Sequence, residues 1–198
     1  MGYGVLKSSK LLFTTNKSRL TKMETLFSII IPTFNRGDLI VNTINSILNQ
    51  KYKNFEIIIV SRNIGIKHAK GNFLTLLDSD DIMYPNCLQD AREFIKLNSN
   101  CHIFHNQYEL INSKGKTTHH YKFKLNIKNA RKEIAIGNFL SCIGAFVSKT
   151  IYSKFMFDED SIVLGSEDWD LWLRILASYR LGQIPKVNCG ILEHHGRS

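Results

Sequence analysis

Three short apolar runs, each followed by a segment of helical character, are the feature that most constrains the fold of this chain. The runs cover residues 27–31, 55–60 and 73–77. A short apolar run closed by polar residues, glycine or proline is typical of a strand buried on both faces of a sheet. Strands that alternate with helices form a parallel sheet, because each parallel connection needs a crossover. The sequence therefore predicts an α/β fold.

A helical pattern follows each of the three runs. After the first run, Asp38 can cap a helix in which apolar residues recur at helical spacing. After the second, Ser61 can cap a short helix that ends at Gly71, since glycine favours the left-handed stop of a helix. After the third, Pro85 stands at the first position of a further helix.

The pattern changes beyond residue 100. Residues 101–111 alternate like an exposed strand, and 112–115 has the composition of a hairpin turn. Residues 141–147 predict another strand. Ser166 can cap a last strong helix over 167–176, in which Trp172 is expected to lie in the core.

Length and composition indicate one globular domain. With 198 residues the chain can bury one core, which we place at 27–198, and 1–26 is expected to be a disordered or extension segment. No apolar run approaches the length of a membrane span. The four cysteines form no Cys-x-x-Cys pair, which argues against a zinc or redox motif and predicts free thiols in a reducing cytoplasm.

The net charge of +9 is unevenly distributed along the sequence. Stretches 1–22 and 114–132 contain lysine and arginine but no acid, whereas acids crowd over 158–170. A basic surface of this kind can be a solvated face, or it can meet diphosphates, anionic lipids or nucleic acid. Stretch 114–132 holds two aromatic residues and matches no nucleic-acid-binding motif, so we expect no nucleic-acid partner.

Three carboxylates within four residues form the strongest local signal. Asp78, Asp80 and Asp81 follow the third predicted strand directly, at the end of the sheet where α/β proteins bind ligands. Their mutual repulsion makes the cluster costly unless a cation offsets it, and carboxylate oxygens suit Mg²⁺ or Mn²⁺ shared with phosphate oxygens. The alternative is an acidic turn that only starts the next helix.

Two further polar clusters lie near the C-terminus. Glu167 and Asp168 begin the last helix, where acids also simply complement the helix dipole. A carboxylate there would stay ionised and could serve as a general base. Trp169 offers a stacking face to a sugar. His194 or His195 could complete a metal shell or bind a diphosphate oxygen, although a surface pair is the alternative.

Together these segments resemble glycosyltransferase family 2, a group of inverting enzymes with the GT-A fold. The resemblance runs in order over about residues 27–195 and is carried by Phe27–Arg36, Phe55–Val60, Arg62–Gly65 with Ala69–Gly71, Leu77–Asp81 and Gly165–Arg174. It implies a Rossmann-like, mostly parallel sheet flanked by helices, in an enzyme of the hexosyltransferase type. It also implies a nucleotide-sugar donor, a glycan or lipid-linked acceptor, and peripheral contact with the inner membrane face.

The resemblance assigns roles to individual residues. Asp168 is implied as the catalytic base, with Glu167 beside it. The residues implied to bind the donor are Thr33, Asn35, Arg36, Arg62 and Asp78. Those implied to bind Mn²⁺ or Mg²⁺ are Asp80, Asp81, His194 and His195. Trp169 is expected on the acceptor side.

One departure from the family concerns the segment after Val60. The family continues there with an acidic segment, a helix and an edge strand, whereas Val60 runs directly into Ser61 and Arg62. About one strand–helix unit, roughly thirty residues, is therefore missing at a sheet edge. The loss would remove a wall of the nucleotide pocket and expose a hydrophobic edge. An inactive relic that keeps the fold is thus the alternative to an active transferase.

Overall fold

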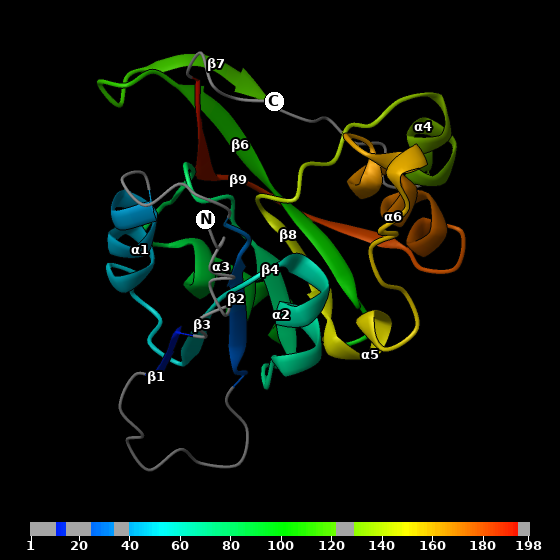
Figure 1. The fold of residues 1–198 in the computed structure, drawn as a ribbon, viewed down its shortest axis with the longest axis horizontal. Coiled ribbons are helices and arrows are strands. Elements are labelled where there is room, and N and C mark those ends of the chain that lie inside the picture. The colour runs from blue at the N-terminus through cyan, green and yellow to red at the C-terminus, as the bar shows by residue number, and fades with distance from the viewer. Residues whose placement is uncertain (1–10, 15–24, 34–39, 122–128, 194–198) are drawn as a thin grey trace, which may run out of the picture.

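The computed structural model describes residues 11–14, 25–33, 40–121 and 129–193. The described residues form one sheet of nine strands with helices on both of its faces (Figure 1). The strands are β1 (Leu11–Thr14), β2 (Phe27–Ile31), β3 (Phe55–Ile59), β4 (Phe73–Leu76), β5 (Ile82–Met83), β6 (Ile103–Ile111), β7 (Thr117–Tyr121), β8 (Ala145–Ser148) and β9 (Leu181–Leu192). The helices are α1 (Ile40–Leu48), α2 (Arg62–His68), α3 (Cys87–Leu97), α4 (Ala130–Ile136), α5 (Lys149–Tyr152), the 3-10 turn η2 (Ser161–Val163) and α6 (Glu167–Leu176).

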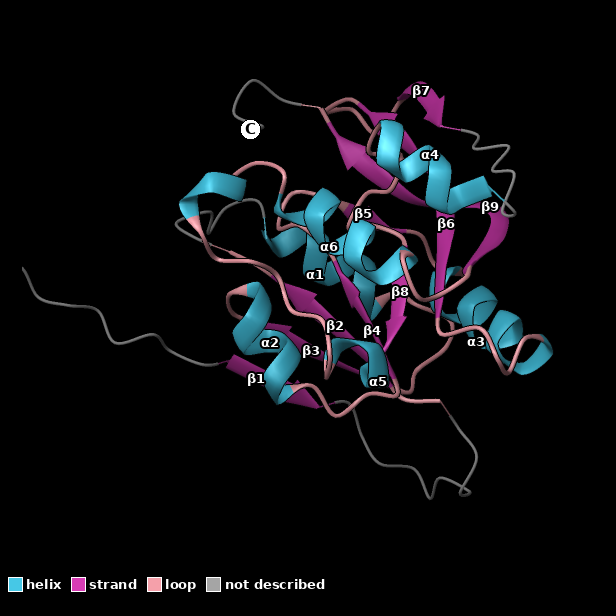
Figure 2. Cartoon of the chain, turned by 90° about the vertical axis from the view of Figure 1, so that its right-hand side faces the viewer, coloured by secondary structure: helices cyan, strands magenta, loops and turns pink. Residues whose placement is uncertain are grey.

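The three predicted apolar strands form the parallel centre of the sheet. Strand β2 lies between β3 and β4, with Ile30 opposite Ile58 on one side and Leu76 on the other. Side chains of β2 alternate between two apolar cores: Ile30 joins the core under α2, α4, α5 and α6, and Ile29 joins the core under α1 and α3. Helices α2 and α5 lie over one face of these strands (Figure 2). Burial on both faces explains why these runs contain so few polar residues.

Outside this centre the sheet is mixed rather than mostly parallel. Its order is β1-β3-β2-β4-β8-β6-β9-β5, and β7 pairs with β6. Strand β8 pairs antiparallel with both β4 and β6, whereas β9 runs parallel to β6. Antiparallel pairs outnumber parallel ones among the described strands, and β6 and β7 form a hairpin.

Several predicted boundaries are confirmed and others are corrected. Helix α6 has the predicted bounds, and Trp172 is fully buried. Helix α2 ends at His68 because Ala69 already has extended backbone angles, and α3 begins at Cys87 because Asp90 N–H bonds to the carbonyl of Asn86. Strand β6 was expected to be exposed but is largely buried, since β8, β9 and β7 flank it and helices cover it.

The edge next to β3 is occupied by the N-terminal segment. Strand β1 pairs antiparallel with β3, from Leu11 opposite Ile59 to Thr14 opposite Glu56. Strand β1 lies within the segment 1–26, which the sequence predicts to be a disordered or extension segment. Asp38 and its expected cap lie outside the described residues.

Gly71 packs so closely against β2 that a side chain does not fit. A Cβ atom there would lie 2.6 Å from both the backbone nitrogen and Oγ of Ser28, and the Gly71 N–H donates to that Oγ at 2.8 Å. We expect Gly71→Ala to lower the free energy of unfolding by about 1–3 kcal/mol in urea denaturation. Gly137→Ala is the matched control, because nothing lies within 4 Å of a Cβ at that position. Equal stability of the two variants would contradict the packing argument.

Candidate active site

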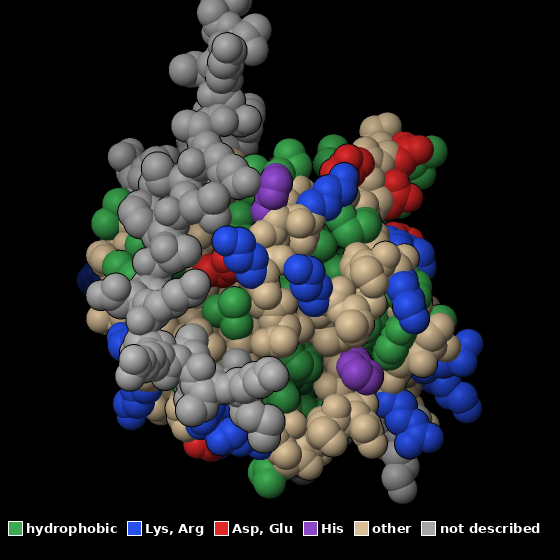
Figure 3. All heavy atoms as spheres, turned by 90° about the horizontal axis from the view of Figure 1, so that it is seen from below, with side chains coloured by type: hydrophobic (Ala, Val, Ile, Leu, Met, Phe, Trp, Pro, Cys, Tyr) green, Lys and Arg blue, Asp and Glu red, His purple; other side chains and the backbone are tan. Residues whose placement is uncertain are grey.

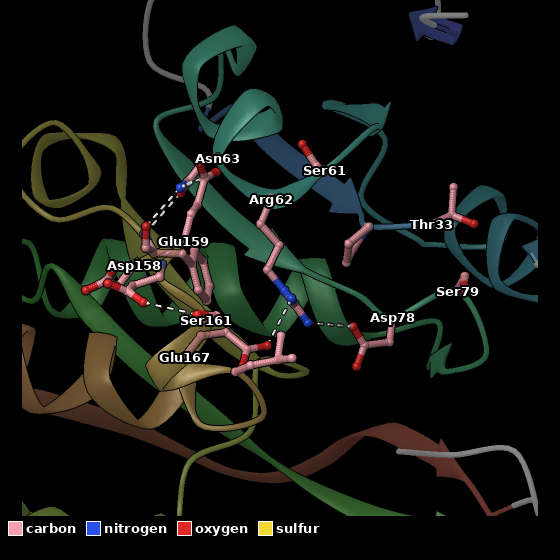
Figure 4. A pocket seen from close by; sticks show the side chains of 14 residues that line it. Thr33, Ser61, Arg62, Asn63, Asp78, Ser79, Asp158, Glu159, Ser161 and Glu167 are labelled. Atoms are coloured by element: carbon pink, nitrogen blue, oxygen red, sulfur yellow. Dashed lines mark hydrogen bonds and ion pairs between the residues drawn. The ribbon is translucent and has the colours of Figure 1, made fainter. Parts of the chain in front are cut away.

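The carboxyl ends of the three parallel strands open into one pocket. Their register brings the residues after β2, β3 and β4 to the same edge of the sheet. The pocket has a volume of about 690 Å³, within the usual range for small-molecule sites. Its lining, part of which Figure 4 labels, consists of Pro32, Thr33, Ser61, Arg62, Asn63, Asp78, Ser79, Phe157, Asp158, Glu159, Asp160, Ser161, Leu164 and Glu167.

A side chain of helix α1 hydrogen-bonds to the backbone of the acidic turn that follows β4. The Thr43 hydroxyl contacts the carbonyl oxygens of Ser79 and Asp81, each at 2.9 Å. Asp81 is fully buried, and its Oδ1 accepts a hydrogen bond from Leu192 N–H at 3.1 Å. Asp80 is also buried, whereas the Asp78 side chain is one-third exposed and faces the pocket. The three carboxylates therefore point to different surroundings.

Arg62 connects the acidic turn to the first residue of α6. Its Nη1 donates to Glu167 Oε1 at 3.1 Å, and its Nη2 lies 3.9 Å from Asp78 Oδ1 (Figure 4). The guanidinium also lies 5.6 Å from the ring centroid of Phe157, in the range of a cation–π contact. Asp78 and Glu167 are 89 positions apart in the sequence (167 − 78), yet both lie beside the guanidinium of Arg62.

Glu167 and Asp168 have different environments, although they are adjacent. Glu167 Oε2 accepts a hydrogen bond from Gly165 N–H at 2.8 Å, so both of its oxygens are engaged. Asp168 accepts from its neighbour Trp169 N–H at 2.7 Å and from Asn138 Nδ2 at 3.3 Å. Burial raises the pKa of Asp168 above its ordinary value, and the two hydrogen bonds and Arg62 oppose that shift. Asp168 is thereby a stronger base than an exposed aspartate.

Of the remaining predicted site residues, Trp169 lies within the described residues and four others do not. The indole N–H of Trp169 donates to the carbonyl of Ile134 at 2.7 Å, so its ring is held half-buried against α4. The positions of Asn35, Arg36, His194 and His195 lie outside the described residues.

A hard divalent cation would find oxygen donors at the acidic turn, but not a complete set of protein ligands within the described residues. No three histidine, cysteine or carboxylate side chains converge as a metal site there. The oxygens of Asp78 and Asp80 suit Mg²⁺ or Mn²⁺ chemically, and phosphate oxygens of a ligand would have to supply further positions.

A buried thiol lies beside these charged groups. Burial raises the pKa of Cys142 well above its usual range, and the negative charges of Asp78 and Asp168 raise it further. Arg62 lowers the pKa of the same thiol, and Glu167 raises it. The Cys142 thiol therefore lies within electrostatic reach of both the acidic turn and the start of α6.

Comparison with known proteins identifies the family of this site. The family model described as Glycosyl transferase family 2 matches residues 28–62 and 60–159, which is more than half of the chain. The chain belongs to glycosyltransferase family 2. The two matched segments overlap at residues 60–62.

Relatives of this chain agree with this family assignment. WfgD of Escherichia coli, a UDP-Glc:α-D-GlcNAc-diphosphoundecaprenol β-1,3-glucosyltransferase, is 28% identical over 84% of this chain and 75% of its own length. An uncharacterized glycosyltransferase of Rickettsia conorii is 27% identical over 82% of this chain. This chain spans 32% of that relative's length.

The fold resembles that of TarS from S. aureus. The crystal structure of TarS residues 1–349 in complex with UDP-GlcNAc has a TM-score of 0.66 and 19% identity, covering 86% of this chain and 59% of that one. The structure of the same TarS segment without a named ligand gives a TM-score of 0.67. The similarity establishes a GT-A type fold, with a curled mixed sheet and flanking helices.

Sequence reasoning missed three residues of this family 2 site. Asn63 lies within the family-like segment Arg62–Gly65, but the resemblance assigns a role only to the neighbouring Arg62. Glu159 and Asn138 lie in no motif, yet they bond to Asn63 and Asp168 respectively. The only available signal was that Asn63 is adjacent to Arg62, because the other contacts join residues that are far apart in the chain.

The surface of this family 2 chain carries scattered basic groups. On the face shown in Figure 3, Lys and Arg side chains are spread among polar and hydrophobic ones, and most of the visible Asp and Glu side chains lie at the upper right. Part of the basic stretch 114–132, namely 122–128, lies outside the described residues. Among the described helices, none has the length and apolar character that crossing a membrane requires.

Proposed function

We propose that this chain transfers a hexose from a nucleoside-diphosphate donor to a hydroxyl group of a glycan or lipid-linked acceptor, with inversion at the anomeric carbon. The observation that carries the proposal is the position of Arg62, between Asp78 and Glu167 in the pocket at the carboxyl ends of the parallel strands. A guanidinium there can bind a diphosphate in the fork geometry that suits phosphate oxygens. It would do so beside the carboxylate pair that begins α6.

Asp168 would act as the general base. It would take the proton of the acceptor hydroxyl while that oxygen forms a bond to the anomeric carbon and the bond to the diphosphate oxygen breaks. Attack opposite to the leaving group inverts the configuration. Asp168 does not line the donor pocket, whereas Glu167 does, so the acceptor would approach from the side of Asn138.

The donor would extend from the end of β2 across the acidic turn. Thr33 lines the pocket there, and by family resemblance Asn35 and Arg36 would contact the nucleoside. We further propose Mn²⁺ or Mg²⁺ as cofactor, held by Asp80 with Asp78 or Asp81, and with His194 or His195 near the diphosphate. When bound, such an ion would offset the charge of the departing nucleoside diphosphate.

The acceptor is proposed from chemistry and similarity. The acceptor of WfgD, α-D-GlcNAc-diphosphoundecaprenol, is a sugar linked to a lipid through a diphosphate. A similar acceptor would bring this chain to the inner membrane face as a peripheral protein, where lysine and arginine side chains favour anionic headgroups.

A catalytically impaired relic is the second candidate. The observation that favours it is the split of the family match at residues 60–62, at one wall of the pocket. A relic would keep the sheet, but it would bind no nucleotide in a saturable manner.

Calorimetric titration separates the two candidates. We expect at least one of UDP, GDP and dTDP to bind saturably in Mn²⁺, and chelation of the metal to weaken binding by about tenfold or more, because the carboxylates would then face the diphosphate without a cation. Absence of saturable heat for all three nucleotides would exclude the transferase and support the relic. If a nucleotide binds equally well with and without the chelator, the proposed metal cofactor is excluded and the proposed transfer reaction is not.

A further inference from the structure

The loop from Phe157 to Ser161 forms the wall at one end of the pocket. Figure 4 shows Thr33 and Ser79 at the opposite end and Arg62 between the two ends. If the nucleoside lies near Thr33 and the diphosphate at Arg62, the transferred sugar must lie toward this loop, beside Glu167. The side chains of the loop would then contact the sugar rather than the nucleotide.

Asn63 fixes this wall from α2. Its side chain is 8% exposed, and its Oδ1 accepts from Phe157 N–H at 3.0 Å while its Nδ2 donates to the Phe157 carbonyl at 2.8 Å. The two bonds to one backbone unit settle the orientation of the amide. Nδ2 also donates to Glu159 Oε1 at 2.8 Å, so a buried, oriented group holds the Glu159 carboxylate at the pocket lining.

The two acidic residues beside Glu159, Asp158 and Asp160, make different contacts. Asp158 Oδ1 accepts from Asp160 N–H at 2.9 Å, and Asp160 Oδ1 accepts from Ile162 N–H at 3.0 Å. Both carboxylates therefore shape the backbone of their own loop. Glu159 differs from them because the described partner of its carboxylate is a side chain of another element.

We propose that Glu159, positioned by Asn63, accepts a hydrogen bond from a hydroxyl group of the transferred sugar and thereby selects a donor with an uncharged sugar. This inference rests on the proposed function and names its substrate class. An ionised carboxylate only accepts hydrogen bonds, so it matches a sugar hydroxyl and repels the carboxylate of a uronic acid. The guanidinium that lines the pocket, Arg62, would be engaged by the diphosphate in the proposed function, so it would not also neutralise such a group.

The test compares UDP, UDP-glucose and UDP-glucuronic acid as ligands of the full chain by calorimetry. We expect the wild type to bind UDP-glucose about tenfold or more tightly than UDP-glucuronic acid, since a hydrogen bond to a charged group is exchanged for repulsion. Glu159→Gln should leave UDP affinity unchanged and reduce this preference to about twofold or less. The side chain is exposed, so the variant is expected to fold.

Asp158→Asn is the matched control, because it removes the same charge from the same loop without touching Asn63. It should retain most of the preference for UDP-glucose. Binding of UDP with no sugar preference in the wild type, or equal effects of the two variants, would overturn the role of Glu159 and leave the proposed function intact. Failure of every nucleotide to bind would instead refute the proposed function.

Discussion

Asp168→Asn is expected to lower the turnover number for sugar transfer by about 10²–10⁴-fold, the usual contribution of a general base. Asparagine keeps the size of the side chain and an oxygen that can accept from Trp169 N–H, and it loses only the longer bond that the second carboxylate oxygen accepts from Asn138 Nδ2. It cannot accept the proton of the acceptor hydroxyl at neutral pH. Donor affinity and thermal stability should therefore change little while turnover collapses, as steady-state kinetics and calorimetry would measure.

Asp170→Asn provides the control for this experiment. Asp170 lies on the same first turn of α6, but its carboxylate pairs with Arg174 one turn later. The variant loses a charge of the same sign near the same helix end and should keep nearly full turnover, since a partly exposed pair contributes little. Turnover by Asp168→Asn that matches the control would remove Asp168 from the role of base.

The sequence predicted the centre of the fold well, because local pattern and tertiary burial agree there. Strands β2, β3 and β4 are apolar since helices cover both of their faces, and that condition is visible in the residues themselves. Helix α6 combines an acidic first turn with an amphipathic pattern, so its bounds were predicted correctly.

Strand β9 shows why the C-terminal half was harder to predict. It contains Gly182, Pro185 and Gly190, which weaken a strand pattern. Its parallel pairing with β6 shifts register twice, so no regular alternation appears in the sequence. The strand is stabilised by pairing with β6 and β5, which are distant in the chain, and a local pattern carries no information about such partners.

The candidate site was likewise predicted only in part from the sequence. Sequence motifs identified Thr33, Arg62, Asp78 and Glu167, which the structure brings to one pocket. They did not reveal that Asp81 turns toward β9, because that orientation depends on a contact with Leu192, which lies 111 positions later. The hold of Asn63 on Glu159 spans 96 positions and was equally invisible. Residue type was predictable, whereas side-chain direction required the tertiary structure.

Arg62→Met is expected to reduce kcat/KM for sugar transfer by about 100-fold, because a charge-assisted contact to the diphosphate is lost and Asp78 and Glu167 keep their negative charges without the guanidinium. Donor affinity should account for most of the loss. Lys67→Met is the matched control, since Lys67 is an exposed cation on the same helix and lies outside the pocket lining. Its kcat/KM should stay within about twofold of wild type, as surface charges contribute little.

The pH–rate profile then distinguishes an electrostatic role of Arg62 from simple loss of packing. Burial raises the pKa of Asp168, and the Arg62 guanidinium partly opposes that rise. Removing the guanidinium should therefore raise the pKa further, and because a base works only when deprotonated, the acidic limb of kcat/KM should move to higher pH. Arg62→Lys keeps the charge and should leave the limb near its wild-type position while still weakening donor binding, since an ammonium cannot form the fork to phosphate. An acidic limb that stays in place in Arg62→Met would mean that Arg62 acts on the donor alone and not on the base.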